Sequence, residues 1–127
     1  MEETILSFGL IKQHNKQLCE VIIDKGVEMD DAIIDEYHAC LNAKYSGPLY
    51  LLVNKKNDYT YTFSAQQRLA TLPNIKAIAV VVYRRSTEIA TQALQNFQRE
   101  IDWNLKIFHD RHEAIDWLES QSAEEIV

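Results

Sequence analysis

The sequence predicts an α/β domain with a mixed, mostly parallel sheet of about five strands, an N-terminal β-hairpin and about four covering helices. Residues 77–83 are consecutive apolar or aromatic side chains, rich in β-branched residues and too few to cross a membrane, which indicates a strand buried on both faces. Helical patterns flank this central strand on both sides along the chain. The 127 residues are enough for a single domain with its own core.

Composition and charge narrow the class of protein. A net charge of -6 argues against a nucleic acid or an anionic membrane as partner, because both are bound through a basic face. The two cysteines, Cys19 and Cys40, lie in apolar-periodic stretches, which indicates buried thiols in a reducing compartment. The acidic start lacks the features of a signal peptide. We therefore expect a cytoplasmic protein without stable membrane insertion.

The N-terminal part predicts a hairpin followed by a helix. Two β-rich runs, residues 5–11 and 18–23, are separated by a polar connection that suits an antiparallel hairpin, whereas parallel pairing needs a longer crossover. A helix is expected after Asp30, a good N-cap, because apolar residues recur at helical spacing beyond it. The Ser-Gly-Pro sequence at residues 46–48 ends this helix.

The middle of the chain predicts a strand and a second helix. Residues 49–53 form the next buried strand, and the polar residues 54–58 form its exit loop. A helix is expected to begin at Ser64, because Ser64 and Gln67 have the spacing of a capping box, in which two side chains satisfy two backbone donors. Pro73 ends this segment, and the central strand follows.

The C-terminal part predicts two further helices around a short strand. Ser86 is placed to cap a third helix. The apolar side chains expected on its inner face are Ile89, Ala90, Ala93, Leu94, Phe97 and Ile101. Residues 105–108 form the final strand, and Asp110 and Glu113 have capping-box spacing at the start of the last helix. The tail from about Ser120 is expected to fray.

Four features carry a family resemblance: the opening hairpin, the strand at 49–53, the run IKAIAVVV at residues 75–82 and, above all, KIFHDRHEAIDWL at residues 106–118. With these features the chain resembles, over nearly its whole length, the bacterial STAS/SEC14-like domains, also called SpoIIAA-like. Most of the matching residues are core and capping residues, so the resemblance bears on fold more than on activity. It implies a binding module, and its SEC14-like side implies an apolar ligand beside the sheet.

The resemblance also implies a candidate for phosphorylation. In anti-sigma-factor antagonists of the wider STAS family, a serine or threonine in an Asp-Ser pair is phosphorylated at the start of the helix after the third strand. Thr60 and Ser64 fall in this neighbourhood. The Asp-Ser pair and the glycine that follows it are missing, so this sequence departs from the family pattern at the residues that would carry the switch.

The candidate binding site lies where the parallel strands end. Ligands of open α/β sheets favour the carboxyl ends of the strands, where helix N-termini point backbone donors outward. The residues that gather there are Asn54, Lys55, Lys56 and Tyr59 after one strand, and Arg84, Arg85, Ser86 and Thr87 after the next. Two basic pairs suit a small anion or an acidic protein segment. The alternative is that these charges solvate loop ends and guard aggregation-prone strands.

Two other groups of residues have a structural and a functional interpretation. His109 and His112 could share a metal only if both lay on one helix, and because His109 is expected to precede the cap, we expect a structural helix start and no metal site. Tyr59, Tyr61 and Phe63 alternate with threonines, which predicts a short strand or an aromatic lip over the crevice, with core packing as the equal alternative. Trp103 and Trp117 are expected to pack in the core or in an interface.

The sequence contains no recognisable motif of an enzyme or a phosphate-binding loop. We therefore expect a non-catalytic binding or regulatory module, without a cofactor, that docks a protein segment or a small anionic ligand at the C-terminal edge of the sheet. The alternative is a carrier or sensor of an apolar or lipid-like ligand. An enzyme would require titratable groups with shifted pKa values that converge in one pocket. A homodimer through an exposed helix or the hairpin edge stays open.

Overall fold

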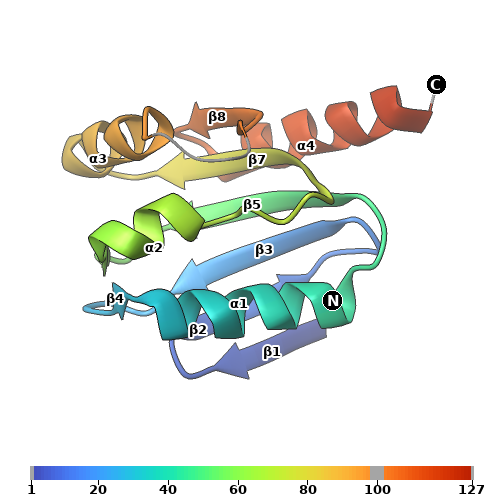
Figure 1. Cartoon of the computed structure of the whole chain (residues 1–127). Coiled ribbons are helices and arrows are strands. Elements are labelled where there is room, and N and C mark those ends of the chain that lie inside the picture. The colour runs from blue at the N-terminus through green and yellow to red at the C-terminus, as the bar shows by residue number, and fades with distance from the viewer. Residues whose placement is uncertain (1, 98–101, 127) are drawn as a thin grey trace.

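The structure, a computed structural model, describes residues 2–97 and 102–126. Its centre is a mixed six-stranded sheet (Figure 1), within which the last four strands are parallel. In spatial order the strands are β1 (Glu2–Leu6), β2 (Gly9–Gln13), β3 (Leu18–Ile23), β5 (Leu49–Lys55), β7 (Ile75–Val82) and β8 (Leu105–Phe108). The predicted α/β class and the mostly parallel sheet are confirmed, with one strand more than expected.

The additional strand comes from the first β-rich run. Residues 5–11 do not form one strand, because the chain turns back between β1 and β2 and the two strands pair antiparallel. The predicted hairpin is present as the antiparallel pair of β2 and β3. The turn consists of Ser7 and Phe8, and the buried ring of Phe8 continues the apolar run, which masks the turn signal of Ser7 and Gly9. The prediction of a single strand over this run is therefore wrong.

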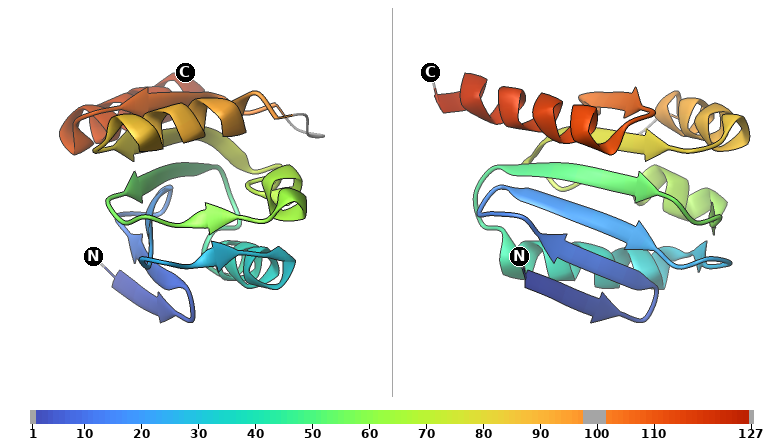
Figure 2. Two further views of the ribbon diagram at one scale, coloured as in Figure 1. Left: turned by 90° about the vertical axis from the view of Figure 1, so that its left-hand side faces the viewer. Right: turned by 180° about the vertical axis from the view of Figure 1, so that it is seen from behind.

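Helices cover both faces of the sheet, as expected. They are α1 (Asp31–Lys44), α2 (Phe63–Arg68), α3 (Arg85–Gln95) and α4 (Arg111–Ile126). The first three connect successive parallel strands and lie on one face, which we call the front face (Figure 1). Because the strand order never reverses from β3 to β8, right-handed crossovers place all three helices on the same side. Seen from behind (Figure 2, right), α4 crosses the other face and leaves β1 and β2 uncovered.

The core has two parts, because side chains of a strand alternate between the faces of the sheet. In β5, Leu51 belongs to the front cluster with Ile34 of α1 and Leu94 of α3. Leu52 belongs to the back cluster, together with Leu118 of α4. All five side chains are buried. The central strand β7 contributes to both clusters, as its continuous apolar run predicts.

The helix starts confirm some capping predictions and correct others. Asp30 is the N-cap of α1, and its side chain accepts a hydrogen bond from the Ile33 amide at 2.9 Å. The N-cap of α2 is Thr62 and not Ser64, because the Thr62 hydroxyl accepts from the Ala65 amide at 3.2 Å. Ser86 does not cap α3, whose N-cap is Arg84 without a side-chain cap bond.

Asp110 lies at the start of α4, as predicted. Its carboxylate accepts a hydrogen bond from the His112 amide at 3.0 Å. The helix runs past Ser120 to Ile126, and fraying of this tail stays a prediction. No helix of the described residues is long and apolar enough to cross a membrane.

The orientation of α3 differs from the prediction. Leu94 is buried as expected, but the other fully buried side chain of α3 is Thr91, which was not expected. Ile89, Ala90 and Ala93 are exposed, so the predicted inner face is wrong for them. The helix ends at Gln95; Phe97 follows it and packs edge-to-face on Phe63 at 5.4 Å between ring centroids, and Ile101 lies outside the described residues.

A second, two-stranded sheet lies beside the main one. It consists of β4 (Glu28–Met29) and β6 (Thr60–Tyr61), which pair in parallel. The short strand that the alternating aromatic stretch predicts is therefore present. Tyr59 and Tyr61 turn inward and pack against the front cluster, whereas Phe63 stays 71% exposed.

Candidate functional site

Two adjoining hollows lie on the front face at the carboxyl end of β5. The first, which we call the groove, has a volume of about 440 Å³ and is bounded by the loop after β5, α2 and α3. The second, which we call the cavity, is a narrow apolar space of about 30 Å³ under the front helices. The side chains that line both are Lys55, Tyr59, Tyr61 and Leu94.

The two hollows differ in chemistry. The remaining lining of the groove is mixed and consists of Asn57, Asp58, Thr60, Gln66, Ser86, Thr87, Ala90 and Ala93. The remaining lining of the cavity is nearly all apolar or aromatic and consists of Val21, Ile23, Met29, Tyr37, Leu51, Val53, Leu69, Ala70, Ile78, Val80, Thr91, Trp103 and Leu105. A polar groove thus leads to an apolar interior, and Lys55 stands at the junction.

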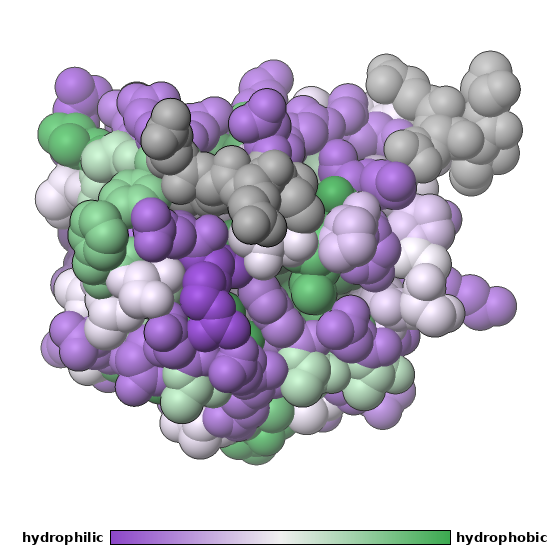
Figure 3. Space-filling model, viewed as in Figure 1, coloured by the Kyte–Doolittle hydropathy of each residue, from purple (hydrophilic) through white to green (hydrophobic). Residues whose placement is uncertain are grey.

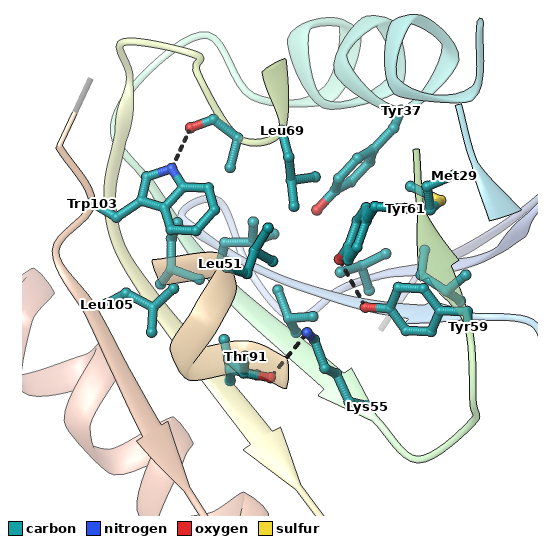
Figure 4. Close-up of a pocket in the computed structure, with 17 residues that line it drawn as sticks. Met29, Tyr37, Leu51, Lys55, Tyr59, Tyr61, Leu69, Thr91, Trp103 and Leu105 are labelled. Atoms are coloured by element: carbon teal, nitrogen blue, oxygen red, sulfur yellow. Dashed lines mark hydrogen bonds between the residues drawn. The ribbon is translucent and has the colours of Figure 1, made fainter. Parts of the chain in front are cut away.

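Lys55 is positioned by the length of β5. The strand continues two residues beyond the end that the sequence predicts, so Lys55 follows Leu51 and Val53 on the front face. Its side chain is buried between the sheet and α3 (Figure 4), and its Nζ donates a hydrogen bond to Oγ1 of Thr91 at 3.1 Å. The Thr91 hydroxyl donates in turn to the carbonyl of Thr87 at 2.8 Å, which leaves its oxygen to accept from Lys55.

No ion pair among the described residues involves Lys55. Burial lowers the pKa of its ammonium from 10.5 to about 8. The Nζ atom lies 5.7 Å from the ring centroids of both Tyr59 and Tyr61, so two aromatic rings give partial compensation. A buried ammonium without a carboxylate partner is unfavourable for folding, and such groups are concentrated at functional sites.

The two tyrosines that flank Lys55 form a hydroxyl pair. Tyr59 and Tyr61 are 3.1 Å apart at their hydroxyl oxygens, and their rings pack edge-to-face (Figure 4). Burial raises the pKa of Tyr59 well above its usual value and that of Tyr61 to about 12. Both phenols are therefore protonated at neutral pH. Because only one proton is used within the pair, the other remains to donate to a ligand.

The far wall of the cavity is held by two hydrogen bonds to the backbone of one residue, Ala70. Trp103 Nε1 donates to the carbonyl of Ala70 at 3.2 Å (Figure 4), and the Ala70 amide donates to Nε2 of His38 at 3.1 Å. Ala70 has a φ of 53°, a conformation that non-glycine residues rarely adopt. Two side chains thus hold an unfavourable backbone conformation at the cavity wall.

Of the residues predicted for the site, the structure brings Lys55, Tyr59, Ser86 and Thr87 together around the groove. The other predicted cations do not line it. Lys56 is exposed, and Arg85 is exposed with its guanidinium 3.7 Å from Glu88. Arg84 pairs with Asp58, whose side chain lines the groove. The two basic pairs that the sequence suggests therefore do not converge on one point.

Asn54 faces the opposite side of the sheet. Its amide donates to the carboxylate of Glu20 at 3.0 Å, and it accepts from the Tyr83 hydroxyl at 2.8 Å. Glu20 also receives two hydrogen bonds from Arg111, at 2.6 and 3.0 Å, and pairs with His14 at 2.8 Å. Burial alone would raise the pKa of Glu20, but the hydrogen bonds from Arg111, Asn54 and His14 lower it to about 2. This closed network anchors α4 to β3.

The candidate phosphorylation sites lie on the surface. Thr60 is exposed in β6, and its amide donates to the carbonyl of Val27 at 3.0 Å. Ser64 is exposed in α2, and its hydroxyl donates to the carboxylate of Asp31 at 2.9 Å. A phosphate on Ser64 would replace this donor with negative charge facing a carboxylate, which is unfavourable. Phosphorylation at either residue stays a prediction.

His109 and His112, at the start of α4, do not both lie on the helix as a shared metal site would require. His109 lies before the helix, with its Nε2 3.2 Å from a carboxylate oxygen of Glu88, whereas His112 lies within the first turn. In the part of the chain that the structure describes, no group of three or more histidine, cysteine, aspartate or glutamate side chains is placed to hold a metal.

Sequence reasoning missed Thr91 and Trp103 as residues of the site, and it named Tyr61 only as part of a possible aromatic lip. If the predicted strand had been extended to residue 55, the alternation of Leu51, Val53 and Lys55 would have indicated that Lys55 points inward. For Thr91, the signal was its spacing of three residues from Leu94 on one face of a helix. No pattern in the sequence links Trp103 to this face.

Comparisons of the chain with protein-family models, with curated proteins and with solved structures give no match. The resemblance to STAS/SEC14-like domains therefore stays a prediction. The interpretation of the site rests on its own geometry.

Proposed function

We propose that the protein is a non-catalytic module that binds a small organic molecule in the groove, with an apolar part directed to the cavity, and that it acts as a carrier or sensor of this molecule. The observation that carries the proposal is the position of Lys55, a buried cation at the junction of a polar groove and an apolar interior. Ligand sites combine mostly apolar walls with a few polar groups that fix orientation.

The dimensions support a small molecule. The groove, at about 440 Å³, is within the range of a few hundred to about a thousand Å³ that is typical of such sites. The cavity holds only about 30 Å³, the space for about two water molecules, so only a narrow group enters it without movement of α3. This combination joins the two alternatives that the sequence leaves open, a small ligand at the sheet edge and an apolar ligand beside the sheet.

Docking of a protein segment is the second candidate, and one observation favours it. Phe63 of α2 and Ile89 of α3 are 71% and 53% exposed. Hydrophobic residues gather over these two helices in the space-filling view (Figure 3). Exposed aromatic and aliphatic side chains beside a groove are suited to a partner. The small-molecule proposal ranks first because a flat partner surface would leave Lys55 buried and unpaired.

The same geometry favours binding over catalysis. Titratable groups with shifted pKa values do converge here, but burial shifts those of Tyr59 and Tyr61 upward, away from the range of a general base. Lys55 contacts a threonine hydroxyl that is already donating elsewhere, and no base among the described residues is hydrogen-bonded to its Nζ. We therefore assign the lysine a role in recognition.

Native mass spectrometry of the protein as purified, followed by denaturing analysis of any released molecule, tests the proposal. We expect a bound small organic molecule, and the same spectra give the oligomeric state. Tryptophan fluorescence gives an independent readout, because Trp103 lines the cavity whereas Trp117 packs on Phe108 behind the sheet. In a Trp117→Phe variant the remaining emission should respond to small apolar acids, alcohols or amines. A protein that retains no molecule and responds to none of these probes would contradict the proposal.

A further inference from the structure

The junction between groove and cavity offers hydrogen-bond donors, but the described residues that line it include no unpaired carboxylate to accept from them. Lys55 has three N–H donors, and the contacts among the described residues satisfy one of them, through Thr91. The hydroxyl pair of Tyr59 and Tyr61 adds a further O–H. The carboxylate that lines the groove, Asp58, is already paired with Arg84. A bound molecule can supply the anionic acceptor that the described residues do not give to Lys55.

We propose that the head group of the bound molecule is a carboxylate, which pairs with the Lys55 ammonium and accepts a hydrogen bond from the Tyr59–Tyr61 hydroxyl pair. The inference rests on the proposed function, and it names the chemical class of the ligand: a small organic acid with a narrow apolar body. A carboxylate is compact and carries two acceptor oxygens, which matches two kinds of donor at one point.

The neighbouring residues favour an acid over an alcohol or an amine. An alcohol would accept one hydrogen bond but would leave the buried positive charge uncompensated, and an amine would add a second positive charge. The apolar body is accommodated by Ala90 and Ala93, which line the groove as the outward-turned apolar side of α3, and by the aromatic cavity wall. The charge and the apolar surface thus select the same class of molecule.

A series of matched ligands tests the inference. Octanoate, octanol and octylamine share one alkyl chain and differ in the head group, and their binding to the Trp117→Phe protein can be followed through Trp103 emission. We expect octanoate to bind at least about tenfold more tightly than octanol, which is the contribution of one charge-assisted hydrogen bond. Octylamine should bind most weakly.

Two lysine variants assign the preference to one residue. In Lys55→Met the preference for octanoate over octanol should disappear, while octanol still binds. Lys56→Met is the matched control, because Lys56 is the next residue in sequence but is exposed and lines neither hollow. It should retain the preference. Thr91→Val, which removes the acceptor of the Lys55 hydrogen bond, should leave the order of the three ligands unchanged.

Equal binding of octanoate and octanol by the Trp117→Phe protein, or a preference for the acid that persists in Lys55→Met, would overturn the carboxylate assignment and leave the proposed function in place. If none of the three ligands binds but the purified protein retains another molecule without an acid group, the assignment also fails alone. Only the absence of both probe binding and a retained molecule would remove the proposed function as well.

Discussion

Lys55 Nζ and Thr91 Oγ1 are 3.1 Å apart. Among the described residues, this is the only hydrogen bond that the buried ammonium of Lys55 donates. The contact joins the end of β5 to the middle of α3. Every other side chain of β5 that faces the front is apolar. A charged lysine among these apolar side chains lowers the stability of the fold. A ligand that neutralised the lysine would recover this stability.

Replacement of Lys55 by methionine should therefore stabilise the ligand-free protein. Burial lowers the pKa of Lys55 from 10.5 to about 8, which corresponds to roughly 3 kcal/mol at neutral pH. Between pH 8 and pH 10.5 the unfolded lysine still holds a proton that the folded one has lost, so the stability of the unmodified protein rises and the difference should close. Urea unfolding of both proteins across this pH range measures the difference in their free energies of unfolding. A Lys56→Met variant should not be more stable than the unmodified protein.

Replacement of Glu20 by glutamine should destabilise the protein by about 3 kcal/mol at neutral pH, because Arg111 loses its charged partner. The pKa of Glu20 lies near 2 instead of 4.5, so the stabilisation is present above pH 4.5 and is lost as the pH falls toward 2. The variant should accordingly show a flatter acid-unfolding curve. The exposed Glu28 provides a control, and an equal loss in Glu28→Gln would argue against the buried network as the cause.

The N-cap of α2 is Thr62 in the structure, whereas the sequence pattern predicts Ser64, and substitutions at the two residues distinguish these alternatives. Thr62 accepts the capping hydrogen bond, so Thr62→Ala should lower the free energy of unfolding by about 1 kcal/mol. Ser64→Ala removes an exposed hydrogen bond to Asp31 and should lower it by only a few tenths of a kcal/mol. The reverse order in thermal unfolding would show that the helix begins at Ser64.

The close approach of β2 and β3 makes Gly9 sensitive to substitution. A Cβ atom at Gly9 would lie 2.3 Å from the carbonyl oxygen of Ile22, which belongs to the backbone and cannot rotate away. Gly9→Ala should therefore lower the free energy of unfolding by roughly 3 kcal/mol or more. At Gly47 nothing lies within 4 Å of such an atom, and Gly47→Ala should have little effect. Similar losses in both variants would contradict the tight packing at Gly9.

The sequence predicts the parts of the fold that depend on periodicity. The apolar run that became β7 and the Asp30 cap of α1 are confirmed. The turn at Ser7 and Phe8 was not predicted, because the apolar, buried Phe8 makes residues 5–11 resemble one continuous strand. The rotation of α3 could not be predicted either: its sequence carries an apolar stripe, but the stripe that includes Ala90 lines the groove, while Thr91 faces Lys55.

The position of the groove could be predicted from the sequence, but its lining could not. Lys55 ends and Tyr59 follows a buried strand, so the rule for parallel sheets places them at the edge where the groove lies. The same rule also selected Lys56 and Arg85, whose side chains point into solvent, because a loop sequence does not tell which of two neighbouring residues turns inward. Tertiary packing makes that choice.

The order of strands in the main sheet has a consequence for biosynthesis. Each strand pairs with the one before it in that sheet, so pairing can proceed in the order in which the ribosome releases the chain. The Glu20–Arg111 pair is different, because its partners are 91 residues apart in the chain. A nascent chain thus carries the Glu20 carboxylate without its arginine partner until the start of α4 emerges, and its sheet gains full stability only at that late point of translation.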